Sequence, residues 1–242
     1  VDEAGYRKEE YPGAIQCMLE LARGPRLVKP PSVKLLSARP KKLGFLRMKP
    51  TSRVAREFQR VALENDVAWG IDFEGSQYGR LRDLLPALRG DFRKFGTTKL
   101  KNWERVLGKD LGQAKAIFIG DDGQGDVQAA MSMATFGPPF AAAFIHQVAE
   151  KVKIGTLPSH PRVFYFQSYL EASRLALQQR LISIDGMQRV RAAVESCNLV
   201  QLCRLHQKDP GKYSKYPCRD GHKLYWPDGS RAELELSEDQ TV

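Results

Sequence analysis

Three acidic residues and the glycines between them form the part of the sequence with the clearest potential for chemistry. Asp121 and Asp122 follow the apolar run Ala116–Gly120, and Asp126 comes shortly after them. Carboxylates gathered at the end of a buried strand repel one another unless a cation lies between them. Mg²⁺ suits such a place because it binds one or two carboxylates and keeps water or phosphate oxygens in its other positions. The alternative is structural, with Asp126 capping the helix that follows.

A hydroxyl and a guanidinium follow an earlier apolar run. Ser37 ends the run Val33–Ser37, and Arg39 comes just after it. A hydroxyl at a strand end can donate a hydrogen bond to a phosphoryl oxygen, and an arginine adds positive charge there. Taken alone, a serine in this position more often belongs to a turn between a strand and a loop.

Lys99 lies in the segment Gly96–Trp103, at the expected start of a helix. A lysine placed there can neutralise both a phosphoryl group and the carboxylate that attacks it. The alternative is an ordinary solvated lysine, which is the common case for a single basic residue.

The order of these three segments is more informative than any one of them. A hydroxyl-bearing strand end, then a lysine, then an acidic and glycine-rich strand end resembles motifs II, III and IV of the haloacid dehalogenase superfamily. More narrowly, the chain resembles the phosphatidate phosphatase-like family of the actin-patch-associated type, over about residues 11–200. The segments that carry this narrower resemblance are Tyr11–Gly13, Ser37–Pro40, Gly96–Trp103, Phe118–Asp126, Phe144–His146 and Val163–Ile184.

The resemblance implies a role for each candidate residue. Ser37 and Arg39 would bind the phosphoryl group, while Lys99 would stabilise both the phosphate and the nucleophile. The ligands of Mg²⁺ would come from the acids, namely Asp121, Asp122 and Asp126. Asp122 stands where that family has a small residue, so the assignment among the three acids stays open.

The resemblance also implies a nucleophile that this sequence does not show. In that superfamily an Asp-x-Asp pattern ends the first strand, where the first aspartate attacks phosphorus and the second acts as acid and base. No apolar strand with this ending precedes Tyr11, so the nucleophile is assigned to no residue of this chain. The motif lies upstream of Val1, or is degenerate, or comes from another polypeptide. Because that strand is central in the family's sheet, we expect some strand to fill its place.

Apolar periodicity predicts an α/β fold. The expected helices cover residues 14–23, 51–64, 99–107, 125–133, 168–179 and 185–205. The expected strands cover residues 33–37, 67–73, 116–120, 141–146 and 163–166. This alternation indicates a Rossmann-like, three-layer parallel sheet with helices on both faces, which binds ligands beyond the carboxyl ends of its strands.

The domain division follows from a change near residue 205, where the helix-and-strand pattern gives way to turn-forming residues. We assign residues 1–205 to a haloacid dehalogenase-like domain and residues 206–242 to a turn-rich C-terminal extension. Within the extension, residues 223–226 could pair with residues 232–236 as a β-hairpin, because Pro227–Ser230 has the composition of a turn.

The formal net charge of +10 is compatible with nucleic acid, an anionic lipid surface or phosphorylated substrates as partners. The basic residues are dispersed and form no nucleic-acid motif, so we do not expect this chain to bind nucleic acid by itself. No apolar run reaches the roughly 18 residues that a transmembrane segment needs. The four cysteines lack CxxC spacing, which favours reduced structural thiols over zinc or disulfides.

Two functions remain open. One is an Mg²⁺-dependent phosphatase for phosphatidate or another phosphorylated lipid or small molecule, with its nucleophile upstream of Val1. The other is a non-catalytic relative that serves as an accessory subunit, with protein partners in a larger assembly. The basic composition, the turn-rich extension and the missing first motif favour the second, and a mitochondrial location fits a basic, processed chain.

Overall fold

The computed structural model describes residues 11–26, 29–40, 48–79, 93–110, 115–122, 125–136, 139–148, 157–196, 218–220 and 223–225. Helices and strands largely alternate along this part of the chain, and the parallel strands form two small sheets, so the fold is α/β. None of the described helices is both long enough and apolar enough to cross a membrane.

The larger sheet has three parallel strands, in the order β3–β4–β5. They are β3 (Ala116–Asp121), β4 (Phe140–His146) and β5 (Val163–Phe166). The central strand β4 is apolar up to its last residue, as is typical of a parallel strand covered on both faces. Asp121, His146 and Phe166 are partners in register, so they form one row at the carboxyl edge of the sheet.

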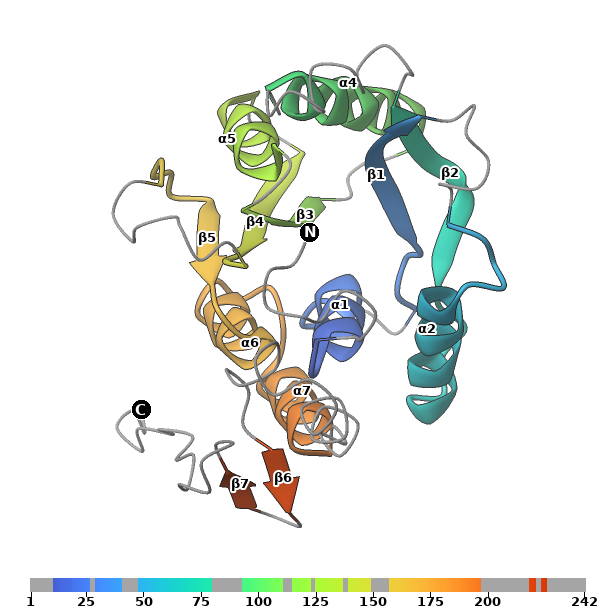
Figure 1. Ribbon diagram of the computed structural model, residues 1–242, viewed down its shortest axis with the longest axis vertical. Coiled ribbons are helices and arrows are strands. Elements are labelled where there is room, and N and C mark those ends of the chain that lie inside the picture. Colours follow the sequence, from blue (N-terminus) through green and yellow to red (C-terminus); the bar gives the residue numbers. More distant parts are fainter. Residues whose placement is uncertain are drawn as a thin grey trace.

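Helices pack on both faces of this sheet (Figure 1). One face is covered by α4 (Arg93–Asp110) and α5 (Asp126–Phe136), and the other by α1 (Ala14–Arg23), α6 (Tyr169–Gln178) and α7 (Ile184–Ser196). Alternate residues of β4 point to opposite faces. Ala143 and Ile145 therefore join the cluster under α5, whereas Ala142 and Phe144 join the cluster under α1 and α6.

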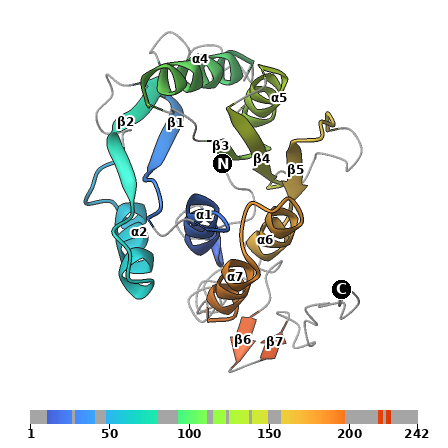
Figure 2. The same cartoon turned by 180° about the vertical axis from the view of Figure 1, so that it is seen from behind.

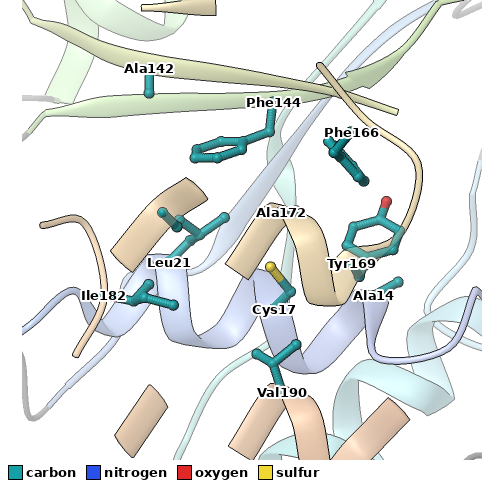
Figure 3. Close-up of a cluster of buried hydrophobic side chains, with 11 residues drawn as sticks. Ala14, Cys17, Leu21, Ala142, Phe144, Phe166, Tyr169, Ala172, Ile182 and Val190 are labelled. Atoms are coloured by element: carbon teal, nitrogen blue, oxygen red, sulfur yellow. The ribbon is translucent and has the colours of Figure 1, made fainter. Parts of the chain in front are cut away.

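The cluster under α1 includes a cysteine (Figure 3). Cys17 and Leu21 of α1 lie beneath Phe144 of β4, with Tyr169 of α6 at the side. Burial, helped by the negative charge of Glu20, raises the pKa of the Cys17 thiol to about 12. Cys17 is therefore a protonated core side chain, as expected for a structural thiol.

The smaller sheet pairs β1 (Val33–Pro40) with β2 (Ile71–Gly79) in parallel, and α2 (Arg53–Glu64) connects them. Their register shifts twice, on either side of Leu36. The hydroxyl of Ser76 accepts a hydrogen bond from the Leu35 N–H at 2.9 Å and donates one to the Asp72 carbonyl. A side chain thus replaces a backbone acceptor where the strands lose register.

Two helices link the sheets. α1 packs Cys17 against the larger sheet and Ile15 and Leu19 against the smaller one and α2. α4 packs on β1, β2 and α5. Figures 1 and 2 show β1 between β2 and β3, and Leu36 of β1 packs against the cluster that includes Phe118 of β3. Within the described residues, β1 pairs only with β2 and β3 pairs only with β4, so each has one edge without a strand partner.

Several sequence-based expectations are confirmed. The helix over residues 14–23 and the strand over residues 163–166 have the predicted bounds. α2 ends at Glu64 as predicted, but it begins at Arg53 instead of residue 51, because the Ser52 hydroxyl caps it by accepting a hydrogen bond from the Ala55 N–H at 3.2 Å.

Other predicted bounds are wrong, most clearly in three elements. The strand expected over residues 67–73 runs instead over Ile71–Gly79, because Val67 bonds back to Ala62 and Trp69 packs on Phe58. The strand expected to end at Ser37 continues to Pro40. The helix expected from Lys99 already begins at Arg93, so Lys99 lies inside it.

The C-terminal region contributes one short antiparallel pair, β6 (Cys218–Asp220) with β7 (Lys223–Tyr225). The partner that we predicted for residues 223–226, at residues 232–236, lies outside the described residues. So do the predicted domain boundary near residue 205 and the end of the helix predicted over residues 185–205, of which α7 is the described part.

Candidate functional site

Asp126 is the first residue of α5 and lies against the end of β3. Gly125 before it has φ +82°, a left-handed conformation that favours glycine. The Asp121 N–H donates a hydrogen bond to Asp126 Oδ2 at 3.2 Å. A Cβ on Gly120 would lie 2.7 Å from that oxygen, so the glycine is what lets the carboxylate approach the strand. The position at a helix N-terminus also favours a negative charge.

Lys99 reaches Asp126 from the neighbouring helix. Its Nζ forms an ion pair with Asp126 Oδ1, and both residues are only 7% exposed. The two helices come close because Gly96 has no side chain: a Cβ there would lie 3.0 Å from both the Gly125 carbonyl and Gln128 Cβ. Lys99 is therefore a buried cation with a specific partner, and the solvated alternative is excluded.

Burial dominates the electrostatics of this pair. It raises the pKa of the Asp126 carboxyl above its ordinary value, while the charge and hydrogen bond of Lys99 act in the opposite direction and the nearby charge of Asp121 raises it further. Burial disfavours the ionised form of a carboxyl, and a neighbouring cation favours it. The Lys99 ammonium therefore offsets part of the effect of burial on the pKa of Asp126.

Asp122 has a different task from Asp126. Its N–H donates to the His146 carbonyl at 3.0 Å, and its Oδ1 accepts a hydrogen bond from the Val148 N–H at 2.9 Å. These bonds extend the β3–β4 pairing beyond the last residue of β4. The extra carboxylate is thus engaged in shaping the loops at the carboxyl edge of the sheet.

The three acids do not form one ligand set for a metal ion. Asp126 is bound to Lys99 and Asp122 to Val148, and among the described residues no three His, Cys, Asp or Glu side chains could together hold a metal. Mg²⁺ can be bound by one carboxylate plus water and substrate oxygens. The residues therefore fit Mg²⁺ only in part: a single carboxylate at the end of β3, that of Asp121, could serve as a ligand beside water and substrate oxygens.

The remaining candidates lie on the smaller sheet. Ser37 is half-buried on β1, within the stretch of shifted register that begins after Leu36. Arg39 belongs to the same strand, and its side chain lies outside the described residues. The described contacts therefore bring together Lys99, Asp121 and Asp126, and place Ser37 on the other sheet that α4 covers.

Sequence reasoning did not anticipate the surroundings of His146. This residue is buried opposite Asp121 in the sheet register, and its Nε2 lies 3.0 Å from the Gln167 carbonyl oxygen. Its ring stacks on Phe166 at 4.8 Å and meets the edge of Tyr11 at 4.4 Å. In the sequence, His146 stood out as the end of the segment Phe144–His146 of the family resemblance and as a histidine that ends an apolar strand, and neither signal gave it a role.

Sequence comparison adds no relative to this description: no family model, curated protein or solved structure matches the chain.

Proposed function

We propose that this chain carries one part of an Mg²⁺-dependent phosphoryl-transfer site of the haloacid dehalogenase-like type. The site would be completed by a further parallel strand between β1 and β3. Its substrate would be a phosphomonoester, for which phosphatidate is the first candidate because of the narrower family resemblance.

The buried ion pair of Lys99 and Asp126 carries the proposal. Removing two charges from water costs several kcal/mol per ion, and packed apolar side chains would often be at least as stable. A buried, perturbed pair at the carboxyl end of a parallel strand is typical of a functional site. The hydrogen bond from the Asp121 N–H to Asp126 also holds Asp121, the candidate metal ligand, beside this ion pair.

Each residue would then have a defined task. Lys99 would neutralise the phosphoryl oxygens and the attacking carboxylate, with Asp126 orienting its ammonium group. Bound Mg²⁺ would supply positive charge beside the transferring phosphoryl group, with Asp121 among its ligands. Ser37 and Arg39 would approach the phosphoryl oxygens from the smaller sheet. The attacking carboxylate itself would come from the added strand.

The same strand would complete the fold. A strand bonded to β1 on one side and to β3 on the other would join the two described sheets into one parallel sheet. α4 and α5 would cover one face of it, and α1, α6 and α7 the other, which is the three-layer Rossmann-like arrangement expected from the sequence. Unpaired strand edges inside a fold leave peptide groups without partners, so such a strand would satisfy them.

A second candidate function is an accessory subunit of a larger assembly, with no catalysis of its own. One observation favours it: the three acids among the described residues do not converge on one metal. In that case the ion pair of Lys99 and Asp126 would serve only to fix α4 against α5.

The two candidates differ in what the added strand does. The test uses a synthetic strand peptide, with about five or six valine and isoleucine residues followed by Asp-x-Asp. The chain and this peptide are mixed with Mg²⁺, and phosphate release from an aryl phosphate and from phosphatidate is measured. We expect release only with chain, peptide and Mg²⁺ together.

Matched variants make the result specific. Release should be lost with Lys99→Met or Asp121→Asn and kept with Lys101→Met, which removes an exposed lysine from the same helix. No release from the wild-type chain with the peptide, when the peptide binds, would overturn catalysis in favour of the accessory function.

A further inference from the structure

Two hydrogen-bond donors on α4 are buried without an acceptor. They are Asn102 Nδ2 and Trp103 Nε1, for which the part of the chain that the structure describes provides no partner. Asn102 is only 1% exposed and Trp103 5%. A buried donor that lacks a partner destabilises a fold, so such groups are rare in native proteins and call for an explanation.

The two donors face different sides of the helix. Successive residues of an α-helix are about 100° apart around its axis. Trp103 points towards α5 and β4, where its ring meets Phe140 at 6.2 Å. Lys99 contacts Asp126 at the middle of the buried face. Asn102 lies on the other side of Lys99 from Trp103, which is the side where α4 packs on β1 and β2.

This side of α4 lies over the region between β1 of the smaller sheet and β3 of the larger one. Both views show α4 extending from β1 and β2 to α5, with β3 below (Figures 1 and 2). Lys99 pairs with Asp126, which lies at the carboxyl end of β3. Trp103, further along α4, contacts Phe140, the first residue of β4. α4 therefore runs from the carboxyl edge of the strands towards their amino ends, and Asn102 lies towards the amino ends relative to Lys99.

We propose that Asn102 sets the register of the strand that completes the sheet, by donating a hydrogen bond from Nδ2 to one of its backbone carbonyls. The proposal rests on the proposed function and adds a residue that determines which segment can complete the site. The occupant is an extended, apolar peptide segment parallel to β1 and β3. Its backbone offers N–H and C=O groups to the edges of both strands, and the second lone pair of one carbonyl is available to the Asn102 amide.

The helix geometry fixes the expected register. Lys99 and Asn102 are separated by about 4.5 Å along α4, from a rise of about 1.5 Å per residue. A strand advances by about 3.3 Å per residue. The carbonyl that accepts from Asn102 therefore belongs to a residue about one or two positions before the one that lies beside Lys99. The amide then places a carboxylate of the strand next to the lysine.

The test compares stability and peptide binding for Asn102→Leu. In the chain alone, leucine removes an Nδ2 donor that has no acceptor, together with the 3.3 Å hydrogen bond that Asn102 Oδ1 accepts from the exposed Arg105. The two changes oppose each other, so thermal stability should stay close to that of the wild type. In the complex, the same change removes a hydrogen bond, so the affinity for the strand peptide should fall by about three- to tenfold. Asn102→Asp should weaken binding further, because a carboxylate would face the carbonyl.

Trp103→Phe is the matched control. It removes an equally unpartnered donor from the same helix, but on the side of α5, so the peptide affinity should stay at the wild-type value. Equal affinities of wild type, Asn102→Leu and Asn102→Asp for a peptide that does bind would overturn the register contact and leave the added strand intact. No binding of the peptide to the wild-type chain would instead overturn the completion of the sheet, and the register contact with it.

Discussion

The sheet β3–β4–β5 and the pair β1–β2 each contain two parallel strands joined by a helix, yet they position their residues in different ways. The larger sheet keeps its register over nearly its whole length, and helices cover both faces. The smaller pair shifts register twice and uses the Ser76 hydroxyl where the backbone has no partner. The acids Asp121 and Asp126 belong to the regular region and Ser37 to the irregular one.

This difference shows what positions each half of the candidate site. In the regular region, the hydrogen bond from the Asp121 N–H holds Asp126 against β3, and Gly120 leaves room for it where any larger residue would collide. In the irregular region, the strands depend on α1 and α4 for their place beside the larger sheet. Changes in the first region should therefore act directly on the candidate site, and changes in the second should act on how the two sheets pack together.

The largest effect is expected for Lys99→Met. The change leaves Asp126 buried without its cation and should lower the free energy of unfolding by about 3–5 kcal/mol near neutral pH. Chemical denaturation measures this loss. The double variant Lys99→Met with Asp126→Asn should recover most of it, because no uncompensated charge then remains buried. A loss that the double variant does not reduce would contradict the role assigned to the pair.

The same variant should change how stability depends on pH. Burial already raises the pKa of Asp126 above its ordinary 3.8, and loss of Lys99 raises it further. A carboxyl with a raised pKa binds its proton more tightly in the folded state, so the free energy of unfolding falls as pH rises from 3.8 through the raised pKa. The loss of unfolding free energy caused by Lys99→Met should therefore be small in acid and grow towards neutral pH.

A smaller loss is expected for Gly120→Ala. The new Cβ would lie 2.7 Å from Asp126 Oδ2 and 2.8 Å from Asp126 Cβ, so β3 and α5 must move apart. Overpacking of this kind costs about 1–3 kcal/mol of unfolding free energy. Gly70→Ala is the control, since no atom lies within 4 Å of the Cβ it would add. Equal stability of the two variants would show that the approach of Asp126 to β3 is not tight.

The smallest effect belongs to the irregular pair. Ser76→Ala removes the acceptor of the Leu35 N–H and should cost about 1 kcal/mol of unfolding free energy. Ser32→Ala, at an exposed serine just before β1, should change little. If Ser76→Ala were as harmful as Gly120→Ala, the two regions would not differ in the way described above.

Elements with clear periodicity could be predicted from the sequence, and contacts between elements could not. The α1 bounds follow from apolar spacing between Gly13 and Gly24. The early start of α4 was missed because Gly96 is used for packing against α5, whereas a glycine usually signals a break. The late start of β2 was missed because Trp69 folds back onto α2.

The candidate site was predicted as residue types but not as an arrangement. Lys99, Asp121 and Asp126 were singled out, and the structure brings them together. That Lys99 pairs with Asp126 while Asp122 bonds to Val148 depends on side-chain directions at the ends of β3 and α5, which no periodicity encodes. Asn102 was part of the Gly96–Trp103 segment of the resemblance but had no role assigned, because only the packing shows that its Nδ2 is buried without an acceptor.

Hydrogen exchange of the backbone amides, with and without the strand peptide, tests most directly whether one strand joins the two sheets. We predict slower exchange in both β1 and β3, which are distant in the sequence, and unchanged exchange in β5, which lies on the far side of β4. Protection of only one of the two strands, or of neither when the peptide is bound, would contradict the completion of a single sheet around Lys99 and Asp121.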